Sequence, residues 1–332
     1  MLQLSKGLHP QNSKLRAAVI GAGEIATGIG GRYGMSHIES YSALPDDVEL
    51  RSFAEISEDR RRIVKESFPF LKAYKNIEDL FAGEKIDILS ICTPDDAHEK
   101  LILKALDYGV KGIWCEKPMA DTIKGAEEII RKSKNAGIAI QVNYFRRFIP
   151  EMHELKMKVL NGSFGDIRLM SGYYADTYAH NGSHLLDLML FFCGSLTLIY
   201  AHAVDKMSRE KDGPVFMECQ AAKGIPCFLK PFPMQFYNIF ELEIFCEYAR
   251  LKICENGRRI EISRAKKDEH ISYLKILNSD PEIIKCRWKD SFKMALTNLI
   301  DVVKGRVDAT ISPPQHSLFI ANVIQNVKES LA

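Results

Sequence analysis

An alternation of short apolar segments with charged segments through the first 140 residues limits what this chain can fold into. The apolar segments predict strands at 15–20, 48–56, 86–93, 112–116 and 138–144. The charged segments between them predict helices at 58–68, 76–83, 97–109 and 121–137. Strands alternating with helices at this spacing are typical of right-handed βαβ units, which build a parallel sheet. We therefore expect residues 1–141 to form an α/β domain.

The pattern changes after about residue 142. Strand-like alternation dominates 196–264, and helices are expected at 150–161, 183–193, 288–304 and 315–331. This order predicts an α+β domain over residues 142–332, built on a large open, mostly antiparallel sheet. A chain of 332 residues suits two domains of ordinary size.

Composition excludes several classes of protein. A formal charge of +2 without a dense basic tract gives no reason to expect nucleic acid or a membrane surface as partner. No apolar run approaches a transmembrane span or a signal peptide, so we expect a cytoplasmic protein. The eight cysteines include no C-x-x-C pair, which favours reduced thiols over a disulfide or zinc framework.

The first predicted strand runs directly into a glycine motif, "GAGEIA". Gly21, Gly23 and Ala26 match G-x-G-x-x-G/A, in which glycines allow a tight turn and close approach of a pyrophosphate. The first domain is therefore expected to be a Rossmann domain that binds NAD(P). The second strand ends at Glu55, where a carboxylate would hold the ribose hydroxyls and disfavour a 2′-phosphate. We expect NAD rather than NADP, although Glu55 as a solvated charge is the alternative.

The third predicted strand leaves the sheet through "ICTPDDAH". Thr93 and Pro94 then lie at the edge of the sheet where ligands bind in open α/β folds. We expect them to line the cofactor together with His98. An ordinary position at the start of a helix is the alternative for His98.

The fourth predicted strand delivers a lysine at the same edge, in "GIWCEKPMAD". Because Pro118 restricts the residue before it to extended conformations, the backbone of Lys117 is expected to be held stiffly. A half-buried lysine with a lowered pKa can accept the hydroxyl proton of an alcohol that loses hydride. A structural ion pair between Lys117 and Glu116 is the alternative.

A third candidate segment is "YAHNGSHLLDLMLFFCG", whose helix is apolar nearly all round and so should be buried. Polar residues inside such a helix must be hydrogen-bonded or functional. His184 could act as a second acid/base, with Asp187 orienting its ring, and His180 should lie just before the helix. A satisfied core histidine is one alternative. A zinc site on the two histidines is another, but no third ligand is evident, so we expect no metal.

Five segments, in this order, resemble the Gfo/Idh/MocA family, the relatives of glucose–fructose oxidoreductase and inositol dehydrogenase: "GAGEIA", "ICTPDDAH", "CEKPMA", "NYFRRFIP" and "HNGSHLLDLMLFFCG". The resemblance covers roughly residues 15–200. It implies that Lys117 is the catalytic lysine and His184 the catalytic histidine. It also implies that Glu116 and Pro118 help place the nicotinamide, and that Arg146 or Arg147 lies near the substrate or cofactor, with Asn143 close by. We expect Asn143 to contact the cofactor and Arg146, Arg147 and Tyr174 to be the substrate residues.

One position departs from the family pattern. The family usually carries an aspartate four residues before the catalytic histidine, and this chain has His180 there. An imidazole does not supply the standing negative charge of a carboxylate. Either Asp187 or Asp176 contributes that charge, or the substrate class differs. The "HNGSH" form resembles members associated with surface-polysaccharide and nucleotide-sugar metabolism.

These features together predict an NAD-dependent oxidoreductase that interconverts a secondary alcohol and a ketone on a sugar, cyclitol or nucleotide sugar. A protein of the same fold that only senses NAD(H), or recycles it in a redox-neutral reaction, is the alternative. Aromatic residues of the second domain are expected to pack against another copy in a homodimer or homotetramer, with ordinary core as the alternative: Phe228, Phe232, Phe236, Tyr237 and Phe240.

Overall fold

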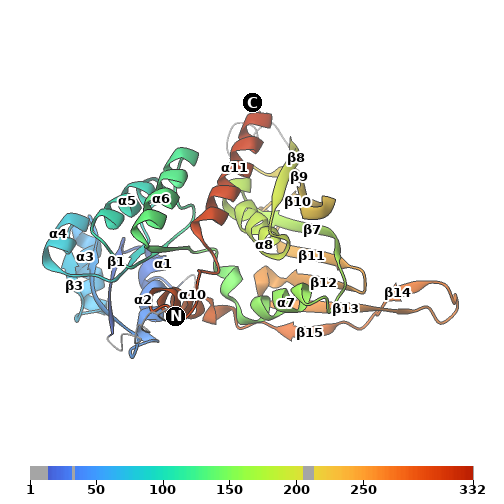
Figure 1. Ribbon diagram of the computed structural model, residues 1–332, viewed down its shortest axis with the longest axis horizontal. Coiled ribbons are helices and arrows are strands. Elements are labelled where there is room, and N and C mark those ends of the chain that lie inside the picture. Colours follow the sequence, from blue (N-terminus) through green and yellow to red (C-terminus); the bar gives the residue numbers. More distant parts are fainter. Residues whose placement is uncertain (1–13, 32–33, 205–212, 332) are drawn as a thin grey trace, which may run out of the picture. The chain divides into compact units, whose positions relative to one another are not determined.

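The computed structural model describes residues 14–31, 34–204 and 213–331, and its chain divides into two compact units (Figure 1). The first unit comprises 1–143 and 292–314, and the second comprises 144–291 and 315–332. The predicted boundary at 141/142 lies close to the observed one. The prediction that everything after it belongs to the second domain is wrong, because 292–314 return to the first unit.

The first unit is built on a six-stranded sheet in the order β3-β2-β1-β4-β5-β6. All neighbouring strands in it are parallel. This order is that of a doubly wound dinucleotide-binding fold, which confirms the predicted Rossmann domain. Its strands are β1 (Leu15–Ile20), β2 (Val48–Ala54), β3 (Lys72–Tyr74), β4 (Ile88–Ile91), β5 (Gly112–Cys115) and β6 (Ala139–Val142).

The helices of the first unit begin and end at the residues that helix signals favour. Ser57, Asn76 and Thr122 each accept a hydrogen bond from a backbone N–H of the first turn, and Gly137 ends α6 in the left-handed conformation. The helices are α1 (Glu24–Thr27), α2 (His37–Ser42), α3 (Glu58–Ser67), α4 (Ile77–Gly83), α5 (His98–Asp107), α6 (Ile123–Ala136) and α10 (Ser291–Val303). The sequence prediction missed α2 and the short strand β3.

Helix α10 joins the first unit because its apolar side packs on strands β5 and β6. A Cβ atom at Gly112 would lie 2.8 Å from a methyl group of Val303, so the helix fits closely against this glycine. The Gln141 side chain donates a 2.7 Å hydrogen bond to the Ala295 carbonyl. An amphipathic pattern shows that a helix buries one face, but it does not say against which sheet.

The second unit carries a nine-stranded sheet in the order β14-β13-β12-β11-β7-β10-β9-β8, with β15 pairing β13. Among the described strands of this second sheet, only β7 and β10 pair in parallel, so the sheet is mostly antiparallel, as predicted. The strands are β7 (Ile167–Ala175), β8 (Leu196–Ala203), β9 (Val215–Ala221), β10 (Ile225–Phe232), β11 (Phe240–Cys246), β12 (Ala249–Cys254), β13 (Arg259–Lys267), β14 (Lys275–Leu277) and β15 (Glu282–Lys285). The helices are α7 (Pro150–Leu160), α8 (Ser183–Cys193) and α11 (Pro314–Leu331).

One face of this sheet is buried by α8, whose described residues from Ser183 to Phe192 are all buried. Gly172 of β7 permits the approach, since a Cβ atom there would lie 2.8 Å from the Leu185 methyl groups. The five predicted oligomer aromatics do not share one environment. Phe236 and Tyr237 are exposed and Phe228 and Phe232 are half-buried, whereas Phe240 is core because its β11 position points to the covered face. Among the described residues, no helix is both long and apolar enough to cross a bilayer.

Candidate active site

A cavity of about 770 Å³ opens at the carboxyl ends of β1, β2 and β4 in the first unit. Gly21 lies at its base with φ +86°, and a Cβ atom there would come within 2.7 Å of the Cys92 carbonyl. Only glycine fits such a position. At Gly23, by contrast, a Cβ atom would meet nothing within 4 Å, which leaves the cavity open beside the backbone. Ala26 is fully buried beneath this turn.

Glu55 lines the same cavity and is held by two backbone groups. Its Oε2 accepts a 2.8 Å hydrogen bond from Ala22 N–H, and its Oε1 accepts a 2.9 Å bond from Ser57 N–H. The carboxylate is therefore tied to the glycine turn, at the position where an acidic residue contacts the ribose in such folds.

Thr93 and Pro94 also line the cavity, as predicted. The Thr93 hydroxyl is buried and has no hydrogen-bond partner among the described residues. Buried hydroxyls are normally satisfied, so an unpaired one on a residue that lines a cavity is a candidate hydrogen-bond partner for a bound ligand. The cavity thus combines an open glycine turn, an anchored carboxylate and an unpaired buried hydroxyl.

His98 does not line the cavity, although we expected it to contact the cofactor. Its ring is fully buried beneath the cavity wall, with Nδ1 2.6 Å from the Pro118 carbonyl oxygen and Nε2 2.8 Å from the Thr93 carbonyl oxygen. The sequence could not show this, because the carbonyl oxygens that bind the ring come from two separate strand ends.

The segment after β5 holds Glu116 in a buried network within the first unit. Glu116 Oε1 accepts hydrogen bonds from His37 Nε2 at 3.0 Å and from Asn143 Nδ2 at 2.5 Å. Burial acts to raise the pKa of Glu116, but these two bonds and the neighbouring Lys117 lower it, so the carboxyl stays ionised. Lys117 thus follows a fixed negative charge, and the Lys117–Pro118 peptide is cis. Glu116, Pro118 and Asn143 lie outside the lining of the cavity described above.

In the second unit, His184 lies in the first turn of α8 and is buried. Its ring meets the rings of Tyr144 and Phe145 edge-on, with centroids 5.6 and 5.8 Å away. His180 lies just before the helix, as expected, and its ring is 6.4 Å from that of His184. His180 Nδ1 is 3.3 Å from the carboxylate of Asp176, which has a left-handed backbone with φ +71°. Asp176 therefore supplies a carboxylate beside His180.

Asp187, which was expected to orient His184, forms a buried ion pair with Arg147. Arg147 Nε lies 2.9 and 2.8 Å from the two carboxylate oxygens, and Nη2 donates to the Asp187 carbonyl. Arg147 Nη1 donates to His316 Nδ1 at 2.7 Å. Burial, opposed by Arg147, raises the pKa of Asp187 to about 6. Both side chains are almost wholly inaccessible to solvent. The predicted contact of Arg147 with a substrate is therefore not supported by its position.

Arg146 behaves differently from its neighbour. Its guanidinium lies over the rings of Phe240 at 3.8 Å and Phe145 at 4.7 Å. Its Nε and Nη1 are buried without a hydrogen-bond partner among the described residues, and burial lowers its pKa to about 9. Tyr174, also expected near the substrate, is fully buried, and its hydroxyl bonds to the backbone of Val215. Tyr174 is a core residue because its β7 position faces the covered side of the sheet.

Comparison with known proteins agrees with this arrangement. Residues 15–144 match a family profile described as "Oxidoreductase family, NAD-binding Rossmann fold" for the Gfo/Idh/MocA proteins. This part of the chain is therefore similar to the NAD-binding domain of the Gfo/Idh/MocA oxidoreductases.

Curated proteins similar to this chain include a myo-inositol 2-dehydrogenase of Thermotoga maritima, 30% identical over 46% of this chain and 42% of that protein. A D-glucoside 3-dehydrogenase of Escherichia coli is 24% identical over 64% of each chain. The chain spans less than half the length of the first of these relatives.

Solved structures extend the likeness of fold to nearly the whole chain. An NAD-binding oxidoreductase from Klebsiella pneumoniae superposes with a TM-score of 0.81 at 16% identity, covering 96% of both chains. A UDP-N-acetylglucosamine 3-dehydrogenase from Acidithiobacillus ferrooxidans gives 0.79 at 17% identity, covering 96% of this chain and 99% of that one. At these identities the likeness establishes the shared fold.

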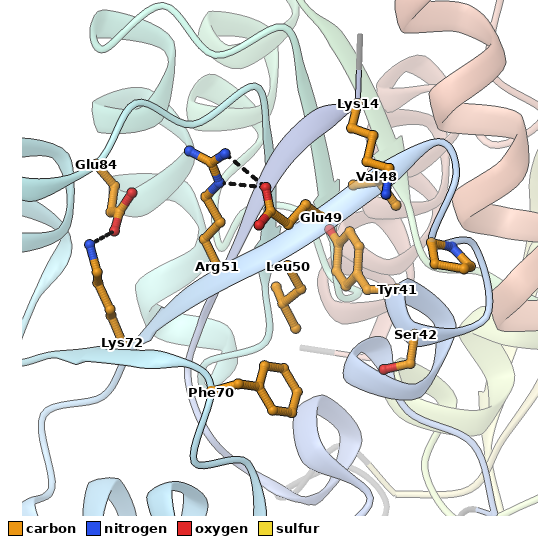
Figure 2. Close-up of a pocket in the computed structure, with 11 residues that line it drawn as sticks. Lys14, Tyr41, Ser42, Val48, Glu49, Leu50, Arg51, Phe70, Lys72 and Glu84 are labelled. Atoms are coloured by element: carbon orange, nitrogen blue, oxygen red, sulfur yellow. Dashed lines mark hydrogen bonds and ion pairs between the residues drawn. The ribbon is translucent and has the colours of Figure 1, made fainter.

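A second hollow of about 570 Å³ lies beside β2 in the first unit (Figure 2). Its floor includes Leu50 and Phe70, and two ion pairs cross its wall: Arg51 with Glu49, and Lys72 with Glu84. These four charges already neutralise each other in pairs. The cavity at Gly21, with its unpaired hydroxyl, is therefore the candidate cofactor site.

The sequence analysis missed two polar residues, one in each unit: His37 in the first and His316 in the second. His37 was assigned to no helix and no site, whereas it begins α2 and donates to Glu116. The residue follows Ser36, a good capping residue, and that signal could have located the helix start. His316, which accepts a hydrogen bond from Arg147, had no local signal because its partner is 169 residues away.

Proposed function

We propose that this chain is an NAD-dependent oxidoreductase that interconverts a secondary alcohol and a ketone on a sugar, cyclitol or nucleotide sugar. The observation that carries the proposal is the cavity at Gly21, with Glu55 anchored at its edge and Lys117 at the end of a strand in the same unit. Relatives named as inositol and glucoside dehydrogenases support the substrate class.

The residues present fit NAD. The open backbone at Gly23 would accommodate the pyrophosphate, and Glu55 would accept hydrogen bonds from the ribose hydroxyls. The buried Thr93 hydroxyl would form a hydrogen bond with the cofactor. Because a carboxylate repels a 2′-phosphate, NAD is proposed over NADP. When bound, NAD would supply the acceptor for the hydride that leaves the substrate carbon.

The protein's own part in the reaction is to move the hydroxyl proton and hold the substrate. We assign the acceptance of that proton to Lys117, with His184 as the second acid/base residue. Lys117 directly follows Glu116, whose carboxyl is ionised, and is half-buried. Arg146, with its unsatisfied guanidinium nitrogens, is proposed to donate hydrogen bonds to substrate oxygens, which removes the cost of leaving those groups unpaired.

The test is a panel of sugars, inositols and nucleotide sugars with NAD⁺, following absorbance at 340 nm for the wild type, Lys117→Met and His184→Gln. We expect NADH formation with at least one polyol, lost by at least 100-fold in Lys117→Met. Tight NAD(H) binding without turnover in either direction would favour the sensor function instead. Turnover of substrate without net NADH would favour a redox-neutral reaction.

The second unit is proposed to form a homodimer or homotetramer through the open face of its sheet. Phe232 stacks on Tyr237 with centroids 4.5 Å apart, and Phe236 and Tyr237 are 67% and 59% exposed. Contiguous exposed aromatics of this kind mark interaction surfaces. Light scattering on the wild type and Phe236→Asp tests this, with Phe70→Asp on the first unit as an equally exposed control. A monomeric wild type contradicts it.

A further inference from the structure

His98 occupies a position that the proposed reaction does not use. It is the first residue of α5 and is fully buried, yet both ring nitrogens make close polar contacts. Nδ1 lies 2.6 Å from the carbonyl oxygen of Pro118, and Nε2 lies 2.8 Å from that of Thr93. The first carbonyl belongs to the segment after β5 and the second to the segment after β4, so the ring spans the ends of two adjacent strands.

The chemistry of these contacts determines the state of the ring. A carbonyl oxygen only accepts hydrogen bonds, so a ring nitrogen must carry a proton to bond to it. A neutral imidazole carries one N–H and could satisfy only one of the two carbonyls. The other nitrogen would then face an oxygen lone pair in a buried site. Both contacts are hydrogen bonds only if the ring is doubly protonated and positively charged.

The surroundings of the ring support that charge. Burial acts to lower the pKa of His98, but Cys115 on β5 and the two carbonyls raise it, to about 10.

We propose that His98 is a positioning residue, a permanently charged imidazolium that ties the Thr93 carbonyl to the Pro118 carbonyl and so fixes the backbone around Lys117. Thr93 lines the cofactor cavity, and Pro118 directly follows Lys117. One ring thereby sets the spacing between the cofactor wall and the proton acceptor. The catalytic consequence rests on the proposed function, whereas the charge and the tie do not.

The charge is tested on the unliganded protein by ¹⁵N NMR of histidine-labelled chain. We expect both ring nitrogens of His98 to show protonated shifts that do not change between pH 6 and pH 9. The signal is assigned by its loss in His98→Gln or, if that variant does not fold, by substituting the other histidines in turn. A ring with one unprotonated nitrogen at pH 8 overturns the proposal.

The tie is tested by hydrogen–deuterium exchange of His98→Gln, with the exposed His153→Gln as control. We expect faster exchange in the peptides covering 91–98 and 112–121, with the rest of the chain unchanged. An increase in exchange rate spread over the whole chain, or an unchanged rate in those two peptides, refutes the positioning role.

With a substrate in hand, His98→Gln should lower kcat at least tenfold while the substrate KM stays within threefold. A merely structural residue would lower the melting temperature and leave kcat of the folded protein unchanged, and that result contradicts the proposal. If no substrate is turned over by the wild type, the proposed function fails while the NMR and exchange results still decide the role of His98.

Discussion

Replacing Asp187 by alanine should destabilise the second unit strongly. The carboxylate and the Arg147 guanidinium are 2% and 1% exposed, and three hydrogen bonds join Arg147 to Asp187. Asp187→Ala leaves the guanidinium buried without its counter-charge, since His316 supplies only a neutral acceptor. Breaking a buried pair in this way costs about 3–5 kcal/mol. For a unit of this size that corresponds to a fall of about 6–20 °C in melting temperature.

Calorimetry and urea unfolding at pH 8, where Asp187 is ionised, measure this loss. The matched double variant Arg147→Met/Asp187→Leu removes both charges, and replacing a buried pair by apolar residues is often close to neutral. The exposed pair of Arg62 and Asp59 provides the surface control, and Asp59→Ala should leave stability unchanged within error. A loss below about 1 kcal/mol in Asp187→Ala would refute the buried-pair reasoning. A double variant as unstable as the single one would show that lost packing, not an unpaired charge, is responsible.

Three further predictions concern the first unit. Glu55→Gln should weaken NAD⁺ binding at least tenfold by calorimetry and reduce the ratio of NAD⁺ to NADP⁺ affinity, with Glu49→Gln as the control. An unchanged NAD⁺ affinity would show that Glu55 is not part of the cofactor site. Gly21→Ala should lower the melting temperature and abolish NAD⁺ binding, because the added Cβ meets the Cys92 carbonyl at 2.7 Å; a variant with normal binding contradicts that clash. Burial acts to raise the pKa of Asp87, but Arg16 and Lys111 lower it to about 2. Its ionised form should therefore contribute roughly 2 kcal/mol at pH 7, lost as the pH falls from about 4 to 2. Urea unfolding of Asp87→Asn should show a deficit that shrinks over that range, and a deficit independent of pH would contradict the assignment.

The Rossmann half could be predicted from sequence because its signals are local. The strand at 15–20, the glycines after it and the Glu55 strand end lie where the alternation placed them. The period of a pattern and the residues that break it are read over a few positions, so long-range contacts are not needed. The sheet against which helix α10 packs could not be predicted, because its apolar pattern would be the same on either sheet.

The strand ends that carry the candidate residues could be predicted, because the carboxyl ends of parallel strands share one edge of the sheet. Thr93 follows β4 and lines the cavity, whereas Glu116 and Lys117 follow β5 and lie outside its lining. The contacts of Asp187, Tyr174 and His98 could not be predicted, because they depend on which elements the fold brings together. Arg147 meets Asp187 across 40 residues, and Tyr174 meets Val215 across 41. A buried polar residue implies that a hydrogen-bond partner exists, but the neighbouring sequence does not identify that partner.

Absorbance at 340 nm with the polyol panel tests whether Lys117 takes part in hydride transfer to NAD⁺. We expect NADH formation by the wild type that Lys117→Met abolishes while NAD⁺ binding, measured by calorimetry, is retained. NADH formation that persists at the wild-type rate in Lys117→Met would contradict it.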